Sequence, residues 1–154
     1  MSAGPLRRLA AAVVFPHELA HALPAVAAGL SITVTPLPEW DGPVSPLWQF
    51  DAELDGESPL WLIRLVAVAP LVVFLGVAAG LRAVDAVSGT AALPVAGTCA
   101  LWGSLSAGDL GVALSPDEAR EAGQFLATVD RRVQLAADLL AVVTTVAVAA
   151  LLLA

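Results

Sequence analysis

Long apolar stretches are the feature that most constrains how this chain can fold. Four stretches of about twenty residues carry few or no charges, and this is the length that crosses the ~30 Å hydrocarbon layer of a bilayer. They cover residues 9–30, 59–81, 87–107 and 133–154. Of the 154 residues, 58% are hydrophobic and only 14% are charged, too few polar side chains to cover the surface of a soluble globule. We therefore expect an all-α polytopic membrane protein with about four transmembrane helices, folded as a single membrane-embedded domain over residues 1–154.

The polar segment 31–58 separates the first two apolar stretches and differs from them in kind. It contains six acidic residues and no basic residue. Residues 32–35 and 48–54 alternate apolar and polar side chains, a pattern typical of half-buried strands. The run Pro-Glu-Trp-Asp-Gly-Pro at 38–43 has the composition of a turn. We predict a small β-hairpin or edge-strand element between the first two spans.

Two further segments are expected to be irregular. The stretch 87–107 is rich in Gly, Ser and Thr and contains Pro94, so it can form a broken or re-entrant helix buried against protein. The second polar segment, 110–132, includes Ser115 followed by Pro116 and two acids, which is the composition of a helix start. A short surface helix is expected to lead from there into the last span.

The charge balance excludes some functions. The net charge is −7, and all seven basic residues are Arg. Nucleic-acid binding depends on clustered basic residues, so we expect no nucleic-acid partner. An acid excess without Lys also indicates a salt-loving source. The single cysteine, Cys99, excludes an internal disulfide and a Cys-based zinc cage.

The first apolar stretch contains the pattern His-Glu-x-x-His, at His17, Glu18 and His21. On a helix, residues four apart lie on one face, so both imidazoles can bind one zinc ion. The adjacent glutamate can act as general base towards a water activated by zinc. Ionisable side chains within a membrane span are costly and indicate function. The pattern predicts a zinc site with Glu18 as the catalytic residue.

Two histidines leave the metal one ligand short, because a catalytic zinc takes three protein ligands and keeps one position open. With no third histidine in the chain, the third ligand should be a carboxylate. Asp109 is the preferred candidate, since it ends the third apolar stretch and its flanking glycines allow close backbone approach. Asp138 and Asp85 are the alternatives.

Other interpretations of the first span remain open at this point. Residues 7–27 also resemble a cleaved signal peptide, with Arg7 and Arg8 before a short apolar run. The polar cluster could instead join helices or relay protons. A metal-binding or metal-transporting membrane protein would use the same histidine pair without needing Glu18, and an inactive subunit would bind no metal.

The His-Glu-x-x-His motif in the first span, the strand-like segment after it and Asp109 near the end of a later span resemble the site-2 protease family of intramembrane zinc metalloproteases. The short chain and its acid excess are similar to a minimal, haloarchaeal member, and a smaller related group of membrane zincins fits the length as well. By this resemblance His17, His21 and Asp109 would bind Zn²⁺, and Glu18 would be the catalytic base.

The resemblance implies an integral protein of a prokaryotic cell membrane that acts as an endopeptidase. Its substrate would be a membrane protein or peptide, cleaved within or beside the lipid bilayer. The strand would pair with the unwound substrate by β-augmentation. The oligomeric state is not indicated by the sequence.

Overall fold

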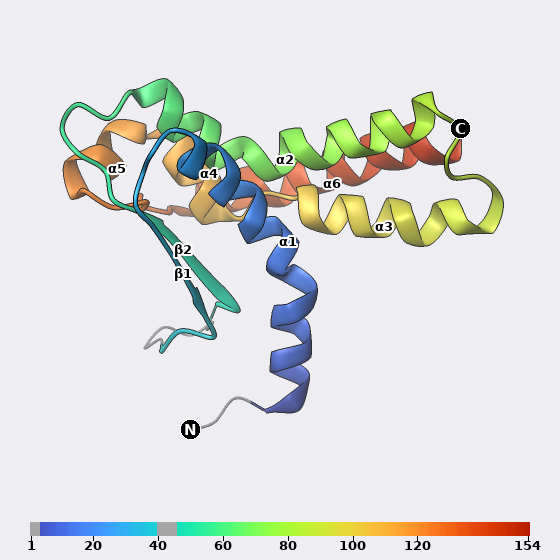
Figure 1. The fold of residues 1–154 in the computed structure, drawn as a ribbon, viewed down its shortest axis with the longest axis horizontal. Helices are drawn as coiled ribbons and strands as arrows, with labels where there is room; N and C mark the ends of the chain where they lie inside the picture. Colours follow the sequence, from blue (N-terminus) through green and yellow to red (C-terminus); the bar gives the residue numbers. More distant parts are fainter. Residues whose placement is uncertain (1–3, 40–45) are drawn as a thin grey trace.

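The computed structural model describes residues 4–39 and 46–154, and these are mainly helical (Figure 1). Their elements are α1 (Pro5–Ala27), β1 (Ile32–Pro36), β2 (Trp48–Ala52), α2 (Leu60–Ala83), the short 3-10 helix η1 (Gly89–Ala91), α3 (Ala92–Gly103), α4 (Ala107–Leu114), α5 (Pro116–Ala122) and α6 (Arg131–Leu153).

Among the described residues, three helices are long and apolar enough to cross a membrane: α1, α2 and α6. They correspond to three of the four predicted stretches. The fourth, 87–107, is divided into η1, α3 and the first residue of α4, with three non-helical residues at 104–106. Helix α3 has 12 residues and a length of about 18 Å, too short for a ~30 Å hydrocarbon layer. The expectation of four spans is therefore not confirmed.

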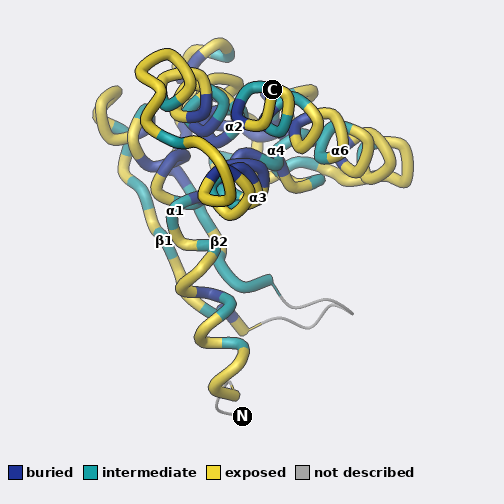
Figure 2. The backbone as a smooth tube through the Cα atoms, turned by 90° about the vertical axis from the view of Figure 1, so that its right-hand side faces the viewer, coloured by how far each residue is buried: buried dark blue, intermediate teal, exposed yellow. Residues whose placement is uncertain are grey.

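Helices α2, α3 and α6 lie side by side, whereas α1 runs across them (Figure 1). The C-terminal half of α1 packs on α2. Its N-terminal half and the hairpin β1–β2 both project away from the three-helix bundle, which is visible from two directions (Figures 1 and 2). The junction between α1, the hairpin and the bundle is where the candidate site described below lies.

Apolar side chains form two cores. One joins α1, the hairpin, α2, α4 and α5 near this junction, and the other joins α2, α3 and α6 along the bundle. Large apolar side chains also remain exposed on the outer faces of α2 and α6, a distribution that suits lipid contact. They include Val72, Val77, Leu139, Val142, Val143 and Val146.

The predicted hairpin is confirmed. Strands β1 and β2 pair antiparallel, with Val34 opposite Phe50 and Pro36 opposite Trp48. The predicted turn at 38–43 lies mostly outside the described residues. Strand β2 ends at Ala52, two residues before the predicted boundary. The Glu53 N–H still donates to the Ser31 carbonyl, but the Leu54 N–H turns away and donates to the Gly123 carbonyl.

The polar segment 110–132 contains the predicted short helix, α5, which begins at Pro116. Ser115 precedes it as expected, although its side chain makes no capping hydrogen bond. The sequence did not predict α4, which begins just after Ser106 and contains Asp109 in its first turn. Asp130 caps α6, accepting two backbone N–H bonds, so this helix begins at Arg131 rather than at 133.

The close approach of α3 to its neighbours generates a prediction at Gly103. A Cβ atom at this position would lie 3.2 Å from Phe74 Cβ and 3.7 Å from Thr144 Cγ2. We expect Gly103→Val to lower the free energy of unfolding by about 1–3 kcal/mol, because the added methyl groups overfill the contact. Thermal unfolding in detergent measures this. Gly97→Val, in the same helix but facing open space, should leave the midpoint nearly unchanged; equal losses in both variants would contradict the assigned contact.

Candidate metal centre

The two histidines of the His-Glu-x-x-His motif lie one turn apart on the buried face of α1, as their spacing predicts. The His17 and His21 Nε2 atoms are 3.2 Å apart. His21 is 1% exposed and His17 8%. Their rings meet edge to face, with centroids 4.9 Å apart. Both Nε2 atoms therefore face one small volume inside the protein.

Asp109 reaches the same volume from α4. Its Oδ1 atom lies 3.2 Å from His21 Nε2, and its Oδ2 atom lies 3.4 Å from His17 Nε2. The three side chains can each offer one ligand atom to a metal ion, within 4.8 Å of one another. The structure thus brings together the three residues that the sequence predicted as ligands, although 88 positions separate His21 from Asp109 (109 − 21).

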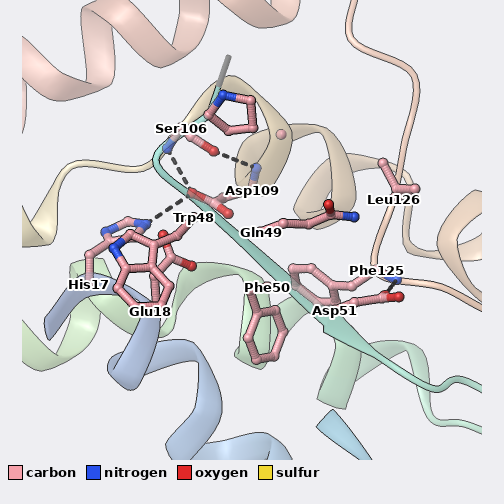
Figure 3. Close-up of a pocket in the computed structure, with 12 residues that line it drawn as sticks. His17, Glu18, Trp48, Gln49, Phe50, Asp51, Ser106, Asp109, Phe125 and Leu126 are labelled. Atoms are coloured by element: carbon pink, nitrogen blue, oxygen red, sulfur yellow. Dashed lines mark hydrogen bonds and ion pairs between the residues drawn. The ribbon is translucent and has the colours of Figure 1, made fainter. Parts of the chain in front are cut away.

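A capping box places Asp109. The Asp109 N–H donates to Ser106 Oγ at 3.1 Å, and Asp109 Oδ2 accepts from the Ser106 N–H at 2.8 Å. This reciprocal pair begins α4 and fixes the carboxylate at the positive end of the helix dipole. The Oδ1 atom is left directed at His21 (Figure 3 shows Asp109 between His17 and Ser106).

The flanking glycines do not act as the sequence suggested. A Cβ atom at Gly111 would meet Ala127 and the 128–129 segment, and one at Gly108 would meet only Ser106 Oγ, at 3.5 Å. Neither glycine allows the histidines to approach. The turn into α4, and not local glycine freedom, brings Asp109 to the site.

Backbone carbonyls determine the tautomer of both imidazoles. His17 Nδ1 lies 2.9 Å from the Trp102 carbonyl oxygen, and His21 Nδ1 lies 2.7 Å from the Val66 carbonyl oxygen. A carbonyl oxygen can only accept, so each Nδ1 must donate its proton. A neutral imidazole has one N–H proton, and here it is on Nδ1. Each Nε2 therefore directs a lone pair at the other Nε2 and at Asp109.

Three electron-pair donors therefore face one another with no hydrogen between them. A buried acceptor left unsatisfied costs about 1–3 kcal/mol, and three in contact also repel. A single proton can join one pair of them, whereas a divalent cation satisfies all three. The spacing of the imidazoles supports this: tetrahedral ligands about 2.0–2.1 Å from zinc lie about 3.3 Å from one another, and the two Nε2 atoms lie 3.2 Å apart. The carboxylate of Asp109 approaches His21 through Oδ1 and His17 through Oδ2.

Glu18 lines a cleft together with His17 and Asp109, and its side chain lies next to that of His17 (Figure 3). The cleft has a volume of about 260 Å³ and none of the described residues lining it is basic. Three acids, Glu18, Asp51 and Asp109, therefore line the cleft without an Arg among its described lining residues, and a divalent cation would offset part of their charge. Strand β2 forms one wall of the cleft, from Trp48 to Asp51.

Two phenylalanines at the site were not predicted. Phe50 of β2 stacks on the His21 ring with centroids 5.4 Å apart, and Phe125 meets the edges of both Phe50 and His21. The Phe125 N–H donates to Asp51 Oδ1 at 2.8 Å, which holds this loop against β2. The alternating pattern of 48–54 was the available signal for Phe50; no pattern in the sequence indicates Phe125.

The alternative ligands lie elsewhere. Asp138 accepts a hydrogen bond from Gln134, and Asp85 pairs with Arg82; both are exposed. Cys99 is buried in the α2–α3–α6 core. Among the described residues, only His17, His21 and Asp109 form a group with this ligand geometry.

Metal binding by this group is testable with Asp109→Asn. The amide can still accept a capping hydrogen bond, but it brings no charge, so we expect metal affinity to fall by more than about tenfold. Metal content and competition with a chromophoric chelator measure the loss in the purified protein. Asp138→Asn removes an exposed acid outside the group and should bind as the unchanged protein does. Equal affinity in both variants would reject Asp109 as a ligand.

Comparison of the chain with protein-family models, with curated proteins and with solved structures found no match. The chemistry of the site has to be inferred from its own residues.

Proposed function

We propose that this protein is a membrane zinc metalloprotease that hydrolyses peptide bonds within or beside the bilayer. The observation that carries the proposal is the convergence of two bare Nε2 atoms and one carboxylate next to a cleft that also contains Glu18. The ring orientation, the ligand spacing and a nearby general base are the parts that this chemistry requires.

Zinc is the metal that fits this set of donors best. Two imidazoles and one carboxylate are ligands of catalytic zinc sites, in which a fourth position remains open. The 3.2 Å separation of the two Nε2 atoms suits a tetrahedral ion. A magnesium or calcium ion prefers six or more oxygen ligands, and the group offers one carboxylate.

The residues of the site would have separate roles in peptide hydrolysis. Glu18 accepts a proton from water and passes it to the amine that leaves when the peptide bond breaks. The carbonyls of Trp102 and Val66 hold the imidazoles in position, and Phe50 shields His21 from water. The chemistry supplied by a bound zinc ion is polarisation of the peptide carbonyl and a lowered pKa for water, towards about 7.

Strand β2 supports an extended peptide as the substrate. It is paired with β1 along one edge, and its residues from Trp48 to Asp51 border the cleft. A peptide lying along the other edge could form main-chain hydrogen bonds with β2, as in β-augmentation. An extended segment is what a protease needs, because a helix hides its carbonyl groups in its own hydrogen bonds.

The three apolar helices support a membrane location and hence a membrane protein or peptide as substrate. The arrangement also supports the resemblance to site-2 proteases: the motif helix comes first, the hairpin follows it, and the aspartate lies on a later helix. We propose that α3 does not cross the bilayer by itself and that its C-terminal end supports the site through the Trp102 carbonyl.

Glu18→Gln is the variant that tests the reaction. We expect it to retain bound zinc and to lose cleavage by about 10²–10⁴-fold, because the amide cannot take a proton from water. Mass spectrometry of an apolar peptide of about 20 residues, incubated with the protein in detergent, measures cleavage. Glu53→Gln, an exposed glutamate just after β2, is the matched control and should cleave at the original rate. Unchanged cleavage by Glu18→Gln would reject the mechanism.

Removal of the metal distinguishes the remaining functions. We expect a chelator to abolish cleavage and added Zn²⁺ to restore it, since every proposed step requires the ion. One equivalent of bound zinc with no cleavage under any condition would favour a metal-binding or transport role. Absence of bound metal from protein purified with zinc present would favour an inactive subunit.

A further inference from the structure

The hydrogen bond that orients His21 depends on an unusual acceptor. His21 Nδ1 donates to the carbonyl of Val66 at 2.7 Å, and the bond is buried. Val66 lies within α2, a helix of 24 residues, and not near either end of it. In a regular helix its carbonyl would be occupied by the N–H of the residue four positions later.

That residue is Pro70, which has no N–H. The Val66 carbonyl is therefore left without its helical donor in the protein interior, where an unpaired carbonyl is costly. Pro70 itself is among the most deeply buried side chains of the described chain. One proline thus creates a free acceptor in the middle of a helix, directly opposite the ring that needs it.

His17 obtains its acceptor in a different way. Trp102 is the penultimate residue of α3, and the N–H four positions later belongs to Ser106, which donates to Asp109 instead. The Trp102 carbonyl is free because the helix ends there. The Val66 carbonyl lies inside a helix and not at its end, so it lacks a helical donor only because residue 70 is a proline.

We propose that Pro70 is a positioning residue of the metal centre. By leaving the Val66 carbonyl free, it holds His21 in the tautomer that presents a bare Nε2 to the metal. Any other residue at this position would bring an N–H that donates to the same oxygen and weakens its bond to His21 Nδ1. The consequence for metal binding rests on the proposed function, whereas the consequence for the His21 ring does not require a metal.

A purely structural role for Pro70 predicts the opposite pattern. If the proline only shaped or packed α2, its replacement would lower stability and affect the site only through unfolding. If it frees the carbonyl, Pro70→Val keeps most of the side-chain volume and restores one helical hydrogen bond. Stability should then be retained or increased while metal affinity falls.

The chain contains only two histidines, which makes the tautomer directly measurable. In full-length protein with ¹⁵N-labelled histidine and no metal, nitrogen chemical shifts report which ring nitrogen carries the proton. We expect both rings of the unchanged protein to be protonated at Nδ1. Pro70→Val should move only the His21 signals towards protonation at Nε2 and leave those of His17 in place.

Zinc affinity is measured on the same samples by competition with a chelator. We expect Pro70→Val to weaken binding by about 10–100-fold, the range for loss of a group that orients a ligand. Pro94→Val is the control: this proline is exposed, in the first turn of α3, and its replacement should change neither the His21 signals nor the affinity. Val148→Ala, in the α2–α3–α6 core, should lower stability without changing the signals.

Two results would overturn the inference. One is a His21 ring in the unchanged protein that lacks the Nδ1 proton. The other is a Pro70→Val variant with unaltered His21 signals and affinity. If Pro70→Val does not fold, a scalar coupling from His21 Nδ1 to the Val66 carbonyl carbon in the unchanged protein tests the bond, and its absence contradicts the inference. A shift of the His21 signals in a protein that binds no zinc would support the role of Pro70 and reject the proposed function.

Discussion

Two hydrogen bonds from imidazole Nδ1 atoms to backbone carbonyls determine what the rest of the site can be. They leave both Nε2 atoms without protons, and they require α1 to pack against α2 and the end of α3 at once. The break after Gly103 serves both parts of the site. It frees the Trp102 carbonyl for His17, and it allows α4 to begin with Asp109 in its first turn. A continuous third span would provide neither.

The electrostatics of the site follow from the same helix ends. The C-terminal end of α3, with its partial negative charge, faces His17, and the N-terminal end of α4, with its partial positive charge, holds Asp109. The partial negative charge of α3 favours a cation on the Nε2 side of the His17 ring. The partial positive charge of α4 keeps Asp109 ionised. Together with Glu18, these groups form a negative surface in a mainly apolar surrounding, where charges interact more strongly than in water. A divalent cation is the partner that balances them.

Local features of the site could be predicted from the sequence, and features that depend on packing could not. The His17–His21 pair needs only helical spacing, and the hairpin needs only alternation and turn residues. Asp109 could be named by elimination among the acids, but its route to the site could not, because a capping box within an apolar stretch resembles the end of a span. The Phe125 contact and the choice of carbonyls depend on which helices meet. Propensity and hydropathy do not contain that information.

A bilayer does not tolerate unpaired backbone groups in contact with lipid, so irregular backbone within a membrane domain survives only where the protein satisfies it. This chain has two such places near the site: the helical bond lost at Pro70 and the break at 104–106. Three backbone groups at these places are paired with side chains of the site: the Val66 carbonyl with His21, the Trp102 carbonyl with His17, and the Ser106 N–H with Asp109. The irregularities and the polar residues therefore stabilise each other. Removal of the histidine would leave the Val66 carbonyl unpaired, and removal of the proline would bring an N–H to that carbonyl in place of His21. The pairing explains how a costly polar cluster and two helix defects can persist together in so apolar a chain.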